Sequence, residues 1–248
     1  MNALILLAGY GSRLSREDLP HKVFLDFGGE SLLNKHLKTL QNAGIEKTVL
    51  VVGYNKGAIK DAVAKMDLTM PIEFIDNDVY RTTGNTLSMV MGLRGMQGDV
   101  LVMDGDLLYP REVLGGFLDK ATGSCFAVVP VDINDVECAK VLLNNDESIA
   151  AIITKRALTD QEKSGYKFSG EAIGFFTLTP HAVDTIIKAY DEQEAHYEPT
   201  LWEILFSEIA DKTPLCVYPL DENGCFEIDT QEDYEEALAC YNANPDRY

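Results

Sequence analysis

The segment ALILLAGYGSRL, residues 3–14, decides the fold class of this chain. Its six leading apolar residues predict a strand buried on both faces, as the strands of parallel sheets are. The two glycines that follow let the backbone turn sharply and pass close to a ligand. We therefore expect a central buried strand that ends in a glycine-rich loop.

This loop is suited to hold an anion. Successive N–H groups in such a turn form a cradle for phosphates, and Arg13 adds a planar cation suited to bidentate phosphate contact. A dinucleotide fingerprint would need glycine in place of Leu14, and a P-loop would need Gly-Lys-Ser/Thr. Neither a dehydrogenase nor a P-loop kinase is therefore supported. The nucleotide contacts expected from the loop are Leu7, Ala8, Gly9, Gly11 and Ser12.

Strand and helix patterns alternate outward from this segment. We expect strands at 48–53, 71–75 and 100–103 and helices at 31–43, 55–66 and 85–93. This rhythm predicts a mostly parallel sheet with helices on both faces. The second half is less regular. Its expected strands are 125–131, 139–143, 149–154, 171–178, 215–218 and 226–228, its helices are 180–190, 199–210 and one that opens at Thr230, and 160–170 is expected as a mobile loop.

Composition limits the classes of partner. The 248 residues suit one α/β domain, and a formal net charge of -19 without any basic stripe argues against nucleic acid. No apolar run approaches the ~18 residues of a membrane span, and the N-terminal run reads as a strand rather than a signal peptide. The five cysteines form no C-x-x-C pair, which favours reduced thiols in a cytoplasmic protein.

Two pairs of acidic residues follow expected strands. Asp104 and Asp106 end the strand at 100–103, and Glu227 and Asp229 precede the last helix. Ligand sites in open α/β sheets lie at the carboxyl ends of strands. Like charges this close repel unless a cation neutralises them, and Mg²⁺ prefers oxygen ligands and bridges to phosphates. The alternative is that these are solvated acids at a turn and a helix cap.

The glycine loop and its continuation resemble a known family. Leu-Ala-Gly-x-Gly-Ser-Arg-Leu followed by Pro and Lys is similar to the signature of sugar-phosphate and choline-phosphate nucleotidyltransferases, and this chain is closest to the choline-phosphate or aminoalkylphosphonate cytidylyltransferases. The family's Pro-Lys appears here as Pro20-His21-Lys22, with His21 inserted. The resemblance implies one domain over residues 1–248 with a Rossmann-like, nucleotide-diphospho-sugar transferase-like fold. It also implies that Arg13 and Lys22 are the catalytic cations that grip the triphosphate.

The same resemblance assigns the acidic residues. In the family, one Asp of the middle motif and one of the late motif hold the catalytic Mg²⁺, and by motif match these are Asp106 and Asp229. Asp104 is then expected beside them at the nucleotide, and Glu227 is an alternate metal ligand.

Later segments resemble the family's base and acceptor pockets. Gly84 and Asn85 fall in the stretch that lines the nucleotide, although Asn85 as a helix cap is an equal alternative. Glu198 and Trp202 match an aromatic and acidic patch of the choline-phosphate branch, suited to an ammonium group, although a helical Trp is more often core. Lys155 matches a lysine that grips the acceptor phosphate in the aminoalkylphosphonate branch, against the alternative of a solvated lysine.

These observations predict a Mg²⁺-dependent enzyme that joins a nucleoside monophosphate, CMP from CTP being favoured, to a small phosphorylated or phosphonate acceptor. Pyrophosphate leaves, and no general base is needed because the acceptor oxygen is already ionised. The main alternative is a sugar-1-phosphate nucleotidyltransferase. A glycosyltransferase is disfavoured, because it releases no pyrophosphate for Arg13 and Lys22 to stabilise, and a non-catalytic nucleotide-binding module is the third alternative. A homo-oligomer is compatible with the sequence, and neither nucleic acid nor membrane is expected as a partner.

Overall fold

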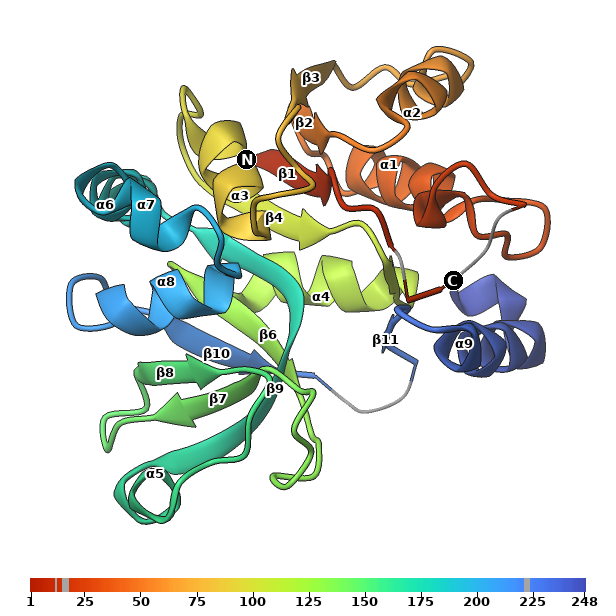
Figure 1. The fold of residues 1–248 in the computed structure, drawn as a ribbon. Helices are drawn as coiled ribbons and strands as arrows, with labels where there is room; N and C mark the ends of the chain where they lie inside the picture. The colour runs from red at the N-terminus through yellow and green to blue at the C-terminus, as the bar shows by residue number, and fades with distance from the viewer. Residues whose placement is uncertain (12, 15–17, 221–223) are drawn as a thin grey trace.

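A computed structural model describes residues 1–11, 13–14, 18–220 and 224–248 of the chain (Figure 1). Its main feature is a nine-stranded mixed sheet in which seven strands follow the order β10-β6-β9-β4-β1-β2-β3. These are β1 (Asn2–Leu7), β2 (Thr48–Val52), β3 (Ile72–Asp76), β4 (Val100–Asp104), β6 (Cys125–Val129), β9 (Lys167–Leu178) and β10 (Cys216–Pro219). The remaining two strands are β7 (Lys140–Leu143) and β8 (Ile149–Ile153). β7 pairs with the N-terminal part of β9, and β8 pairs with β7.

The sheet is parallel except for the pairs that β9 makes and for the antiparallel pair of β7 and β8. β1 pairs in parallel with both β2 and β4, β2 pairs in parallel with β3, and β10 with β6. β9 runs antiparallel to β4 and β6 and so joins strands from both halves of the chain into one sheet. The expectation of a mostly parallel, mixed sheet is confirmed. Its consequence is that the carboxyl ends of β1 and β4 lie at one edge.

Helices cover both faces of the sheet (Figure 1). Alternate residues of β1 divide between two cores, with Ile5 in one and Leu4 in the other. The first core contains residues of α1 (Leu32–Asn42), α2 (Lys56–Val63), α4 (Arg111–Lys120) and α9 (Gln231–Ala243). The second contains residues of α3 (Asn85–Leu93), α6 (Pro180–Glu192), α7 (Glu194–Tyr197) and α8 (Trp202–Ile209).

Two of the longer segments differ from the expectation. The segment 160–170 is not a loop: it holds the short helix α5 (Asp160–Gly165) and the start of β9. A capping box between Thr159 and Glu162 opens this helix. The helix buries none of its residues, which is consistent with its polar sequence. Helix α4 was not expected at all, since Gly115 and Gly116 interrupt its apolar pattern, although Leu114 and Phe117 are fully buried.

The other elements that were expected lie within a few residues of their ranges. Ser31 caps α1, and the expected capping box between Thr230 and Asp233 opens α9. The chain is completed by the one-turn 3₁₀ helices η1 (Lys22–Phe24) and η2 (Pro245–Arg247) and by the two-stranded sheet of β5 (Leu107–Leu108) and β11 (Phe226–Glu227). The short elements α7, β5, η1 and η2 were not expected. All five cysteines are free thiols. In the part of the chain that the structure describes, no helix has the length and hydropathy needed to span a bilayer.

Candidate active site at the carboxyl ends of the strands

Acidic side chains from two distant parts of the chain meet at the end of β4. β5 pairs antiparallel with β11, and the Ile228 N–H donates to the Asp106 carbonyl (3.0 Å). This small sheet places the segment around residue 228 beside the turn that follows β4. As a result, carboxylate oxygens of Asp106, Glu227 and Asp229 all lie within 4.8 Å of one another.

Two cations from the N-terminal loop contact this cluster. Lys22 Nζ donates to Asp106 Oδ2 and also lies 3.2 Å from Asp229 Oδ1. An Arg13 guanidinium N–H donates to Asp229 Oδ2 at 2.5 Å. Lys22 is mostly buried and Arg13 mostly exposed. Burial lowers the pKa of Lys22, but the Asp106 and Asp229 carboxylates outweigh that effect and raise the pKa, so Lys22 is held as a cation.

His21 is a positioning residue that the sequence analysis did not recognise. Its ring is buried, Nδ1 accepts from the Val23 N–H (3.1 Å), and Nε2 lies 3.0 Å from the Gly9 carbonyl. A carbonyl only accepts, so Nε2 carries the proton in a neutral ring. Burial followed by the nearby Lys22 charge lowers the pKa of His21 to about 4, which keeps it neutral. The inserted histidine therefore ties the glycine loop to the turn that carries Lys22.

Crowding and burial disfavour ionisation of several acids at this edge. Burial, then the Asp106 charge, then that of Glu203, raise the pKa of Asp104. Burial and the neighbouring aspartates likewise raise the pKa of Glu227. A cation bound among these groups would relieve the repulsion and restore their charges.

The donor set fits a hard divalent ion. Asp106 Oδ1 is buried and has no hydrogen-bond partner among the residues that the structure describes. An unpartnered buried carboxylate oxygen is costly unless something binds it. Three carboxylates with an unused oxygen are the kind of ligand set that Mg²⁺ takes, usually with few protein ligands and with substrate phosphates completing the shell. Asp106, Glu227 and Asp229 are therefore the residues that would hold the ion.

A cavity of about 170 Å³ lies between the glycine loop and the start of α3. Of the expected nucleotide contacts, it is lined by Leu7, Ala8, Gly9, Gly84, Asn85 and Asp104. Gly11 instead supports Lys22: it has φ +63°, and a Cβ there would lie 3.2 Å from Lys22 Cδ. Ser12 lies outside the described residues.

Gly84 and Asn85 join this cavity to the neighbouring helix. A Cβ on Gly84 would lie 1.8 Å from the Thr200 carbonyl oxygen, so only glycine fits. Gly84, rather than Asn85, is the N-cap residue of α3. Asn85 Oδ1 accepts from the Trp202 N–H (2.8 Å) and so holds the start of α8.

A larger cleft of about 550 Å³ adjoins the acidic cluster. Lys155, Glu171, Trp202 and Glu203 are among its lining residues. Lys155 has φ +55°, a left-handed conformation that is uncommon for a residue with a side chain and is often kept at functional sites. Glu198 is absent from the described lining, and its backbone carbonyl instead accepts from the Gly84 N–H (2.8 Å). The role expected of Glu198 stays a prediction, and Glu203 is the acid of α8 among the described residues that line the cleft.

Trp202 belongs to both the core and the cleft. It is 2% exposed and packs against Phe126, Phe176 and Phe206. Its indole Nε1–H donates to Asp104 Oδ2 (3.3 Å). The ring is thus mainly core, and its polar edge orients a carboxylate at the site.

Comparisons with known proteins agree with this geometry. The family model described as "MobA-like NTP transferase domain" matches residues 3–202. A choline-phosphate cytidylyltransferase of Haemophilus influenzae is 27% identical over 249 residues, which cover 100% of both chains. A bifunctional protein GlmU of Acaryochloris marina is 33% identical over 78% of this chain, and the match spans 42% of that protein.

Solved structures share the fold over almost the whole chain. The CTP:phosphocholine cytidylyltransferase from Streptococcus pneumoniae has a TM-score of 0.74 at 20% identity, covering 96% of this chain and 97% of that one. The inositol-1-phosphate CTP transferase from T. maritima has a TM-score of 0.72 at 25% identity, covering 97% and 96%.

The glycine loop, the sheet and the acids at the end of β4 are those of a nucleotidyltransferase. More specifically, the chain belongs to the MobA-like NTP transferase family, whose model matches most of its length.

Proposed function

We propose that the protein transfers CMP from CTP to a small zwitterionic acceptor, such as phosphocholine or an aminoalkylphosphonate, and releases pyrophosphate. Two similarities support the nucleotide: the Haemophilus choline-phosphate cytidylyltransferase aligns with the entire chain, and the inositol-1-phosphate CTP transferase is 25% identical with a TM-score of 0.72.

The mixture of charges in the large cleft is the observation that carries the acceptor class. Glu203 is 8% exposed, and its Oε2 has no hydrogen-bond partner within the described part of the chain. Glu171 and Lys155 line the same cleft, and the Lys155 charge is close enough to act on the pKa of Glu203. An acceptor with a cationic head and an anionic end would satisfy both kinds of group. A sugar phosphate has no cation to offer the buried carboxylates.

The chemistry follows from the placement of the cations. The acceptor oxygen forms a bond to the α-phosphorus, the bond to the bridging oxygen breaks, and pyrophosphate leaves with that electron pair. Lys22 and Arg13, which both contact the Asp229 carboxylate, neutralise charge on the phosphates and help to align them. Mg²⁺, when bound by Asp106, Glu227 and Asp229, supplies further charge neutralisation at the phosphates.

Pyrophosphate release, measured for CTP, UTP, ATP, GTP and dTTP against a panel of acceptors, tests this proposal. The panel contains phosphocholine, phosphoethanolamine, 2-aminoethylphosphonate, inositol 1-phosphate and glucose 1-phosphate. We expect the highest kcat/KM for CTP with an acceptor that carries an amine or quaternary ammonium group. Equal rates with inositol 1-phosphate, which has the anion without the cation, would contradict the acceptor class.

A sugar-1-phosphate nucleotidyltransferase is the second candidate, because the GlmU relative is the more identical one over the region it shares with this chain. In the same assay that function predicts preference for glucose 1-phosphate or another sugar 1-phosphate, together with UTP or dTTP. The two functions therefore differ in both substrates of a single measurement.

We expect Glu203→Gln to raise the KM for a cationic acceptor by roughly 10- to 100-fold, because one charge-assisted contact contributes about 1.5–3 kcal/mol. The KM for CTP should stay within about twofold, since Glu203 does not line the nucleotide cavity. Glu192→Gln, at the exposed end of α6, is the matched control. An unchanged acceptor KM in the Glu203 variant would exclude this residue from recognition.

The same carboxyl group makes the stability of the free protein depend on pH. Burial raises the pKa of Glu203 from its ordinary value of 4.5 to about 7. The folded state then binds more protons than the unfolded state between these values, so its stability falls as pH rises from about 4.5 to about 7. Glu203→Gln removes this loss. We expect its Tm to exceed that of the wild type at pH 8, with no such gain at pH 4.5, in thermal unfolding without ligand. A gain of the same size at both pH values would rule out ionisation as its cause.

A further inference from the structure

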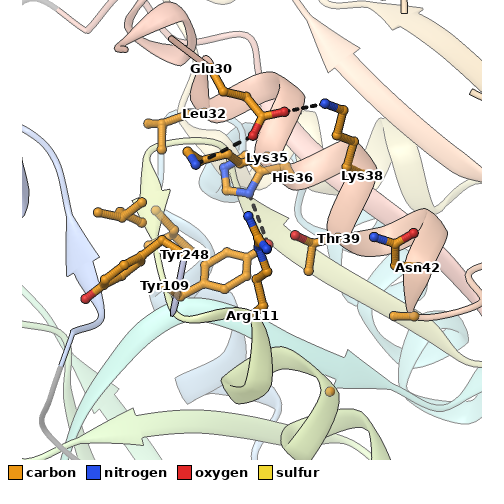
Figure 2. Close-up of a pocket in the computed structure, with 14 residues that line it drawn as sticks. Glu30, Leu32, Lys35, His36, Lys38, Thr39, Asn42, Tyr109, Arg111 and Tyr248 are labelled. Carbon is orange, nitrogen blue, oxygen red and sulfur yellow. Dashed lines mark hydrogen bonds and ion pairs between the residues drawn. The ribbon is translucent and has the colours of Figure 1, made fainter. Parts of the chain in front are cut away.

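A third cavity, of about 440 Å³, lies away from the two cavities of the proposed active site (Figure 2). It is formed by α1, the segment 107–109, the start of α4 and Tyr248. None of the described residues that line it lines either active-site cavity. The volume is within the range of about 300–1,000 Å³ that is typical of small-molecule sites.

Basic side chains converge on this cavity although the protein has a net charge of -19. Lys35, Lys38 and Arg111 all line it, and Figure 2 shows Glu30 as the carboxylate between the two lysines. Glu30 lies 2.5 Å from Lys38 Nζ and 3.6 Å from Lys35 Nζ. Arg111 has no ion pair or hydrogen bond among the described side chains. Burial lowers the pKa of Lys35, and the nearby positive charge of Arg111 lowers it further. Among the described residues that line the cavity, one carboxylate faces three cations, and Asp26 outside the lining also acts on Lys35, so the lining itself carries excess positive charge.

The other walls are apolar and neutral polar. Leu32, Leu107, Leu108 and Tyr109 are all at most 6% exposed, and Thr39 and Asn42 add a hydroxyl and an amide at the rim. A guanidinium and an ammonium beside an apolar wall suit a phosphate ester whose organic part is apolar or aromatic. A phosphate alone would leave the apolar wall uncovered.

A buried histidine connects this cavity to the metal carboxylates. His36 Nε2 lies 3.3 Å from the Gly105 carbonyl oxygen, and Nδ1 lies 3.1 Å from the Tyr109 hydroxyl. Burial lowers the pKa of His36 to about 4, so the ring is neutral. Because the carbonyl must accept, Nε2 donates to Gly105 and Nδ1 accepts from Tyr109. The chain of hydrogen bonds therefore runs from a wall of the cavity to the residue between Asp104 and Asp106.

The turn at Gly105 has little room to absorb a displacement. A Cβ on Gly105 would lie 2.1 Å from Leu7 Cδ2, at the end of the strand that leads into the glycine loop. Movement of Tyr109 or His36 is therefore passed to the aspartates on either side of Gly105, because packed side chains transmit strain.

We propose that this cavity binds a small organic phosphate and that its occupancy changes the affinity of the Asp106 cluster for a divalent ion. The site lies outside the proposed active site and does not depend on the identity of the acceptor. By linkage, a ligand that alters metal binding has its own affinity altered by the same factor when the metal is bound.

Titration calorimetry with phenyl phosphate, in EDTA and without CTP, tests the binding site directly. We expect saturable binding that is weaker for inorganic phosphate and absent for phenol. Arg111→Ala should weaken binding of phenyl phosphate at least about tenfold. Arg94→Ala, at an exposed arginine at the end of α3, is the matched control and should leave binding unchanged. Thermal unfolding of both variants checks that each remains folded.

Three results would overturn the site. These are no saturable binding of phenyl phosphate, equal binding by Arg111→Ala, and loss of binding in Lys155→Ala, which would place the probe in the large cleft instead. Sedimentation without ligand can give a fourth overturning result. If the wild type is a dimer and Arg111→Ala is a monomer, the cavity is assigned to contact with a second copy of the chain. The assay contains neither nucleotide nor metal, so its failure is distinct from failure of the proposed CMP transfer.

The coupling is tested by Mn²⁺ binding, followed by electron paramagnetic resonance with and without saturating phenyl phosphate. We expect phenyl phosphate to change the Mn²⁺ Kd at least threefold in the wild type and in Arg94→Ala, as for two coupled sites. In Arg111→Ala the Kd should stay constant. An unchanged Kd in the wild type, or a shift that persists in Arg111→Ala, would overturn the coupling.

Discussion

Asp106→Asn is expected to lower kcat by roughly a hundred- to a thousandfold without unfolding the protein. The change keeps the shape of the side chain but removes the charge that, in the proposed site, binds Mg²⁺ beside Glu227 and Asp229. It removes a like charge that raises the pKa of Asp104 and of Glu227, but it also removes one of the two carboxylates that pair with Lys22, so the variant without metal should lose less stability than Lys22→Met does. Pyrophosphate release over a range of Mg²⁺ concentrations, together with thermal unfolding, measures both effects.

Two comparisons make this result specific to the metal site. Asp229→Asn should behave in the same way, because the Asp106 and Asp229 carboxylates both accept a hydrogen bond from the Lys22 ammonium and belong to the same cluster. Asp184→Asn, on an exposed position of α6, should leave both kcat and Tm unchanged. Wild-type turnover in the Asp106 or Asp229 variant would show that the residue is not a metal ligand.

Lys22→Met is expected to have the second largest effect, a loss in kcat of roughly a hundredfold or more with little change in the acceptor KM. Methionine keeps most of the buried stem but removes the charge proposed to stabilise the departing pyrophosphate. Since Lys22 is the partner of Asp106 and Asp229, its loss should also destabilise the metal-free protein by about 3–5 kcal/mol. Mg²⁺ should restore part of this stability by binding only the folded state.

Steady-state kinetics and thermal unfolding with and without Mg²⁺ separate these two roles. Lys60→Met, at an exposed lysine of α2 that pairs with Asp76, is the control for removing an ion pair. If the Lys22 variant raised only the acceptor KM and kept kcat, the residue would belong to the acceptor site and not to the triphosphate.

Local patterns in the sequence predicted those elements whose own residues specify them. Helix α1 has Ser31 as its cap and buries Leu33, Leu37 and Leu40 on one face, so both its start and its orientation are written in a short window. β1 and β4 are continuous apolar runs because the sheet buries both of their faces. Helix α4 was not predicted because two glycines lower its helical propensity. In the folded protein, packing of Leu114 and Phe117 compensates for the glycines.

The residues of the candidate site likewise divide into those that short motifs predict and those that only packing places. Arg13, Lys22, Asp106 and Asp229 were predicted from the types of residue in short motifs, and the structure brings all four together. Glu198 and Glu203 lie five residues apart; the sequence favoured Glu198, whereas Glu203 is the one among the described residues that line the cleft. Which acid enters the cleft depends on where α8 begins, and the bond from the Trp202 N–H to Asn85 decides that.

The sequence by itself determined the α/β class, the glycine-rich loop after β1 and the chemical groups of a nucleotidyltransferase, because each of these depends on residues that are neighbours in the chain. Only the tertiary structure decided which groups meet. β5 and β11 are two residues long and carry no pattern of their own, yet their pairing carries Asp229 to Asp106 across more than a hundred residues. The cavity beside His36 likewise exists only once α1, α4 and the C-terminal Tyr248 have packed together, since no local interaction defines it.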